Sequence, residues 1–84
     1  MIRTTVKPAF PMDRRKAAII AGTAARFDCT VTLEGSGLIL NLKSIIGLLS
    51  QTAVPQFPMD LICDGMDEEA ASLAVTDAFQ EIAG

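Results

Sequence analysis

The chain has 84 residues, of which half are hydrophobic and one fifth are charged, and its formal net charge at pH 7 is −3. A chain of this length buries only a modest core, so we expect one domain that spans residues 1–84. The absence of histidine excludes Ser-His and Cys-His nucleophilic catalysis, and the two cysteines, Cys29 and Cys63, fit no metal-ligand spacing. We therefore expect no cofactor and no metal site, and we interpret both cysteines as small core or strand residues, with a disulfide between them as the alternative.

The N-terminal part of the chain predicts a strand followed by a helix. Residues 2–7 alternate apolar and polar side chains and are rich in β-branched types, and two prolines follow them. Asp13 is a good N-cap for a helix over residues 14–26. Gly22 weakens this helix by roughly 1 kcal/mol relative to alanine unless close packing explains it. The apolar residues at the spacing of one buried helix face are Ala17, Ile20, Ala21 and Ala24.

The middle of the chain predicts a hairpin and a short helix. Residues 30–34 and 38–42 form the two strands, joined by Gly35-Ser36-Gly37. The side chains expected to face the core are Val31, Leu33, Leu38, Leu40 and Leu42. Ser44 then begins a short helix, and two prolines mark an irregular loop after it.

The C-terminal part predicts a fourth strand over residues 59–64 and a final helix that three acidic residues lead after Gly65. Met59, Leu61 and Cys63 are expected inside, with Ile39 and Ile62 on the outer sheet face. The final helix has the clearest amphipathic pattern in the chain, formed by Ala71, Ala74, Val75, Ala78, Phe79 and Ile82. Since each strand has one apolar side, we predict an α+β fold in which three helices cover one face of a four-stranded antiparallel sheet.

Charge is segregated along the chain. Residues 1–43 hold all 7 basic side chains and have a net charge of +4, whereas residues 44–84 have a net charge of −7. The basic residues are few and there is no Tyr or Trp, which disfavours nucleic-acid binding. The longest uncharged stretch is broken by polar residues and prolines, so no membrane-spanning helix is expected. We interpret the protein as cytoplasmic.

Several of these stretches resemble HPr, the histidine-containing phosphocarrier of the bacterial sugar phosphotransferase system, and its catabolite-repression homologue. The similar stretches are Asn41-Leu42-Lys43-Ser44-Ile45, Thr23-Ala24-Ala25-Arg26-Phe27-Asp28, Leu33-Glu34 and Asp64-Gly65-Met66-Asp67-Glu68. The resemblance covers nearly the whole chain and implies an open-faced β-sandwich with the element order βαββαβα. It also implies two phosphorylation sites.

The first implied site is altered in this sequence. The phosphocarrier histidine of the family lies in a Gly-Ile/Leu-His-Ala-Arg-Pro-Ala motif at the start of the first helix. The matching residues 11–17 keep only Arg15 and Ala17, and Asp13 takes the place of the histidine. Asp13 is interpreted first as a helix N-cap. Alternatively, it forms an acyl phosphate or supplies a permanent negative charge that resembles the phosphorylated family member.

The second implied site is retained, because Ser44 matches the regulatory serine of the family. Ser44 can act as a simple N-cap, and it can also be phosphorylated, since a phosphate at a helix start gains backbone N–H partners. The family places exposed apolar docking residues after this serine, and Ile45, Ile46 and Leu49 match them. Leu48 is expected in the core. We expect the starts of the first and second helices to lie side by side.

Three basic residues, Arg14, Arg15 and Lys16, follow Asp13 in a helix turn whose dipole favours anions. They either meet an anionic partner surface or phosphate, or form a solvated turn that pairs with Asp13. The first hypothesis for the protein is a regulatory or binding module without catalytic activity, whose partners are proteins such as HPr kinase or a transcription regulator. The alternatives are a phosphocarrier that uses Asp13, and an oligomeric module in which a homodimer forms through the sheet.

Overall fold

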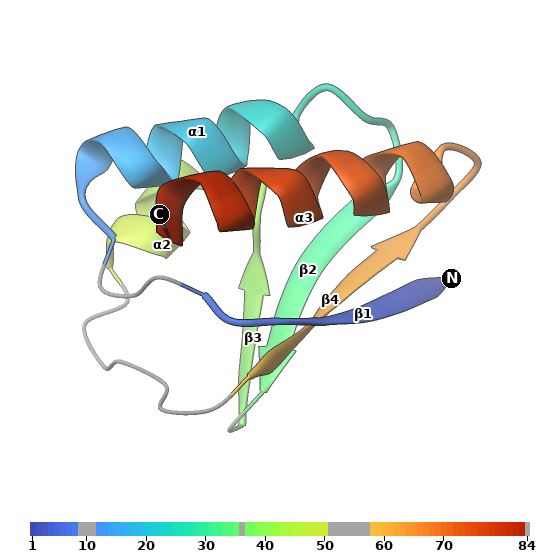
Figure 1. The fold of residues 1–84 in the computed structure, drawn as a ribbon, viewed down its shortest axis with the longest axis horizontal. Helices are drawn as coiled ribbons and strands as arrows, with labels where there is room; N and C mark the ends of the chain where they lie inside the picture. Colours follow the sequence, from blue (N-terminus) through green and yellow to red (C-terminus); the bar gives the residue numbers. More distant parts are fainter. Residues whose placement is uncertain (9–11, 36, 51–57, 84) are drawn as a thin grey trace.

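The computed structural model describes residues 1–8, 12–35, 37–50 and 58–83, which form four strands and three helices (Figure 1). In chain order the elements are β1 (Ile2–Val6), α1 (Arg14–Ala24), β2 (Thr30–Gly35), β3 (Leu38–Asn41), α2 (Ile45–Leu49), β4 (Met59–Asp64) and α3 (Glu68–Ala83). The predicted α+β class and the order βαββαβα are confirmed.

The sheet is antiparallel throughout and has the strand order β1-β4-β2-β3. Leu61 of β4 lies near the centre of the sheet, opposite Thr4 of β1 on one side and Leu33 of β2 on the other. Strand side chains alternate between two faces, so one face of the sheet supplies the core. The buried strand residues of this core are Val6, Val31, Leu33, Met59, Leu61 and Cys63.

Helices α1 and α3 lie beside each other over this face and run in opposite directions (Figure 1). The α1 residues predicted to be buried are all buried. Helix α2 packs against α1 and follows directly from β3. In α3, Ala74 is only half-buried, and the predicted list missed Ser72. Ser72 is buried because its hydroxyl hydrogen bonds that of Thr4 over 3.1 Å, which satisfies a polar group beneath the helix.

The predicted element ends differ from the structure by one or two residues. Strand β1 ends at Val6, and α1 ends at Ala24 because the residues after it form a hydrogen-bonded turn. In this turn the Arg26 N–H donates to the Thr23 carbonyl, and the Phe27 N–H donates to the Ala24 carbonyl. Pro11, Ser36 and Pro55, which the sequence analysis assigned to turns or loops, lie outside the described residues.

The outer sheet face differs from the prediction at Ile62. Ile39, on edge strand β3, is 72% exposed as expected, but Ile62 is only 7% exposed although it lies outside the core cluster. Ile62 sits on central strand β4, where Arg3 of β1 and Thr32 of β2 flank it. Since so little of Ile62 is exposed, it offers almost no apolar surface for association of two sheets.

Gly22 is exposed, and a methyl group added at its Cα would meet no atom within 4 Å. Close packing therefore does not explain this glycine. We expect Gly22→Ala to stabilise the protein by roughly 0.5–1 kcal/mol, since alanine loses less backbone entropy in a helix. Urea unfolding measures the change, and an unchanged or lower midpoint would contradict it.

Gly65 is the matched control. Its φ is +156°, and an added Cβ would lie 2.6 Å from Cβ of Cys29. Gly65→Ala should therefore destabilise the protein in the same unfolding experiment, because the end of β4 and the start of β2 would have to separate.

Candidate functional site

The start of α1 carries Asp13 as its N-cap, as the sequence predicted. Asp13 has extended backbone angles, and its Oδ1 accepts a hydrogen bond from the Lys16 N–H over 2.8 Å. The side chains of Asp13, Arg14 and Arg15 are exposed, and that of Lys16 is half-buried. Within the described residues no ion pair joins this basic turn to Asp13. The structure therefore supports the capping role and leaves the two arginines open to solvent.

The start of α2 carries Ser44 as its N-cap. Its backbone is extended, and its Oγ accepts a hydrogen bond from the Gly47 N–H over 3.1 Å. Ser44 is half-buried, so its hydroxyl lies near the surface while it caps the helix. The preceding turn is fixed by Asn41, whose side-chain oxygen accepts a hydrogen bond from the Lys43 N–H over 3.0 Å.

The apolar residues after Ser44 divide as expected. Leu48 is fully buried, whereas Ile46 is 80% exposed. We call the three large exposed side chains of this helix the α2 patch, which consists of Ile45, Ile46 and Leu49. A five-residue helix can bury only one side, so this sequence necessarily leaves aliphatic groups in contact with solvent.

Within the described part of the chain, the start of α2 is bonded to the turn after α1, and not to the start of α1. The Lys43 ammonium donates a hydrogen bond to the Phe27 carbonyl over 2.7 Å, which ties the start of α2 to the turn after α1. Asp13 and Arg15 lie at the opposite end of α1, whose 11 residues span about 16 Å. Among the described residues no hydrogen bond or ion pair joins Ser44 to Asp13. The structure brings α2 against α1 but does not link the two predicted site residues.

Sequence reasoning missed the role of Asp67. Its carboxylate accepts hydrogen bonds from the backbone N–H groups of Asp28, over 2.8 Å, and Cys29, over 3.0 Å. These bonds, the Asp28 bond first, lower the pKa of Asp67 below its ordinary value. The position of Asp67 before α3 signalled a helix cap, but its partners lie 38 and 39 residues away in sequence and no local pattern reveals them.

The two cysteines are buried and free, as expected for core residues. Burial, and after it the neighbouring Asp67 carboxylate, raise the pKa of the Cys29 thiol to about 11. In the parts of the chain that the structure describes, no three His, Cys, Asp or Glu side chains gather where they could hold a metal ion. None of the described helices has the length and apolar character needed to cross a membrane.

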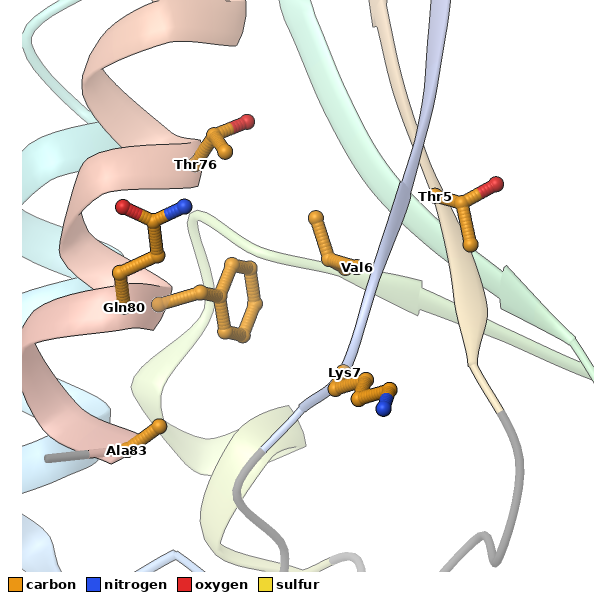
Figure 2. Close-up of a pocket in the computed structure, with 7 residues that line it drawn as sticks. Thr5, Val6, Lys7, Thr76, Gln80 and Ala83 are labelled. Atoms are coloured by element: carbon orange, nitrogen blue, oxygen red, sulfur yellow. The ribbon is translucent and has the colours of Figure 1, made fainter.

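A hollow of about 250 Å³ lies between the end of β1 and the last turns of α3 (Figure 2). Its lining consists of Thr5, Val6, Lys7, Thr76, Phe79, Gln80 and Ala83. Figure 2 shows the Lys7 and Thr5 side chains on the side of β1 that faces away from α3. A small-molecule site needs polar groups that converge on the ligand, and those of this hollow do not.

The comparisons with known proteins identify the family. The family model described as the PTS HPr component phosphorylation site matches residues 2–81. The chain therefore belongs to the HPr family of the phosphotransferase system. Among curated proteins, the phosphocarrier protein HPr of Treponema pallidum is 36% identical over 66 residues, which cover 79% of this chain and 75% of that protein.

Solved structures give the same assignment. HPr-C-His from Thermoanaerobacter tengcongensis matches with a TM-score of 0.81 and 29% identity, covering 96% of this chain and 93% of that one. Crh of Bacillus subtilis matches with a TM-score of 0.75 and 32% identity, covering 96% and 95%. The Crh structure is described as a dimer with a swapped domain. The chain thus resembles both the phosphocarrier and its catabolite-repression homologue.

The capping role of Asp13 is testable by substitution. Asp13→Ala should lower the free energy of unfolding by roughly 1 kcal/mol, because the Lys16 N–H loses its acceptor. Asp13→Asn keeps an acceptor oxygen and should leave the stability nearly unchanged. Urea unfolding of the two variants separates capping from charge, and equal destabilisation by both would contradict the capping role.

The bonds of Asp67 predict a specific acid response. Because the folded-state pKa lies below the ordinary value of 3.8, the stabilisation is complete above that value and is lost as pH falls through the folded-state pKa. Asp67→Asn should lower the melting temperature at neutral pH and flatten its decline at acid pH. Asp77→Asn, which removes an exposed carboxylate within the following helix α3, is the control. An Asp67→Asn profile parallel to that of the native protein would contradict the assignment.

Proposed function

We propose that this chain is a regulatory, protein-binding member of the HPr family that does not carry phosphoryl groups at the start of α1. The observation that carries the proposal is the chemistry at that position. The sequence contains no histidine, and Asp13, which takes the place of the family's phosphocarrier histidine, caps the helix. The proposal assigns no catalytic activity to the chain and places it in the cytoplasm.

The alternative, phosphoryl transfer through Asp13, requires a different acceptor chemistry. A carboxylate can form an acyl phosphate. In this structure, however, one carboxylate oxygen is occupied by the Lys16 N–H, and among the described residues no carboxylate cluster surrounds Asp13 that could hold a supporting metal ion. These features favour a structural cap that also keeps a constant negative charge beside Arg14 and Arg15.

Ser44 is the phosphorylatable residue in this proposal. It occupies the place of the family's regulatory serine, and its hydroxyl lies at the first turn of α2 next to the exposed aliphatic side chains. A phosphate there keeps the Gly47 N–H as a hydrogen-bond donor and adds about two negative charges at pH 7. Phosphorylation would therefore change the charge of the surface without requiring α2 to unfold.

The partner surface combines the α2 patch with the charged start of α1. Exposed aliphatic side chains can fill an apolar pocket on a partner and provide most of the binding energy. Asp13 and Arg15 add a charge pattern that a partner can recognise. We propose a protein partner that contacts this surface, such as HPr kinase or a transcription regulator, in a complex that Ser44 phosphorylation alters.

Phosphoryl transfer assays test the proposal. With labelled phosphoenolpyruvate and Enzyme I the native chain should remain unlabelled. With labelled ATP and HPr kinase it should be labelled at Ser44, as located by mass spectrometry. Ser44→Ala should abolish the label and Ser50→Ala, which changes a serine at the other end of α2, should keep it.

Two outcomes would contradict the proposal. Label from phosphoenolpyruvate that disappears in Asp13→Asn would establish the phosphocarrier alternative. Absence of kinase label in a chain whose circular dichroism shows a folded protein would remove Ser44 as the regulatory residue and leave only the binding role.

A further inference from the structure

The outward faces of α1 and α3 carry opposite charge. Along α1 and the turn after it, the exposed residues are Arg14, Arg15, Ala18, Gly22, Ala25 and Arg26, which we call the α1 stripe. Along α3 as far as Glu81, the exposed residues are Glu69, Ala70, Leu73, Asp77, Gln80 and Glu81, which we call the α3 stripe. The α1 stripe contains three positive charges and no negative one, and the α3 stripe contains the reverse.

The shapes of the two stripes also differ in a complementary way. The centre of the α1 stripe is flat, because its residues are alanines and Gly22, where even a methyl group would meet no atom within 4 Å. The α3 stripe carries Leu73, which is 70% exposed and protrudes from the helix. Small residues on one helix allow another helix to approach closely, and a large aliphatic residue on the other fills the space between them.

Within one molecule these charges do not satisfy each other. The ion pairs among the described residues involve the N-terminal amine and Arg3, and none involves a member of either stripe. The helices lie side by side and antiparallel, so both stripes belong to the same outer layer (Figure 1). Because the two helices are antiparallel, the basic start of α1 lies beside the C-terminal end of α3, which carries Asp77 and Glu81.

We propose that the α1–α3 layer binds a second copy of this chain face to face. A two-fold axis that runs along the helices places each α1 stripe over the α3 stripe of the partner, and the same rotation makes the second contact equivalent. Opposite charges then meet at both contacts, which no single acidic or basic partner would achieve. The commitment to a second copy follows from this symmetry.

The size of the α1–α3 face bears on the affinity of the proposed self-association. Helices of 11 and 16 residues offer a face of roughly 24 by 20 Å, smaller than the roughly 800 Å² that each partner buries in a standard interface. We expect self-association to be weak, because the face is smaller than a standard interface, and to weaken further at high salt. Because Arg15 belongs to both surfaces, the dimer excludes the protein partner proposed above.

Amide NMR spectra at increasing protein concentration test the proposal. The amide chemical shifts of residues in the α1 and α3 stripes should change with protein concentration, and these changes should become smaller at high salt. Arg26→Glu and Asp77→Lys should each raise the dissociation constant roughly tenfold or more, since each places like charges opposite one another. Lys7→Glu makes the same charge change as Arg26→Glu at an exposed residue outside both stripes and should leave the constant nearly unchanged.

Three results would overturn the inference. The chain could remain monomeric at millimolar concentration, the shifts could map to the edge of β1 or the outer sheet face, or Arg26→Glu and Lys7→Glu could weaken association equally. The last result would assign the effect to net charge. None of these results depends on phosphorylation of Ser44, so the function proposed above is tested separately.

Discussion

The turn between α1 and β2 is the point at which all three helices are held to one another. The Asp67 carboxylate, at the start of α3, accepts hydrogen bonds from the N–H groups of Asp28 and Cys29. Lys43, immediately before α2, donates to the Phe27 carbonyl in the same turn. Gly65 lies so close to Cys29 that no side chain fits between them. The residues that precede α2 and α3 are thus both hydrogen bonded to the turn after α1.

The residues that hold α2 in place are therefore not the residues that a phosphoryl transfer at the start of α1 would need. The proposed partner surface depends on α2, which is too short to be stable by itself and is held through Leu48, Ser44 and Lys43. The phosphoacceptor position at the start of α1 contributes a cap, for which aspartate serves as well as other capping residues. A family member can therefore lose its histidine and keep its fold, because the fold needs a hydrogen-bond acceptor at that position and not an imidazole.

Local patterns were sufficient for most of the fold. Alternation predicted the strands, helical spacing predicted the buried face of α1, and the cap signals at Asp13 and Ser44 are both observed. The errors involve residues whose environment is set by distant segments. Ile62 has a surface pattern but lies on a central strand, where Arg3 and Thr32 flank it. Ser72 is buried, and Thr4, far away in sequence, is its hydrogen-bond partner. Asp67 could be predicted as a helix cap but not as the acceptor for another turn.

The central claim is that this chain retains the HPr scaffold and that the loss of the acceptor histidine at position 13, rather than the other changes in residues 11–17, ends phosphoryl transfer. The most direct measurement is phosphorylation of Asp13→His by phosphoenolpyruvate and Enzyme I, followed by identification of the modified residue. The account predicts a phosphohistidine at position 13 in this variant, because α1, Arg15 and the α2 patch are all in place. A folded Asp13→His protein that accepts no phosphoryl group would show that the other changes in residues 11–17 have also abolished the acceptor function, and would contradict the account.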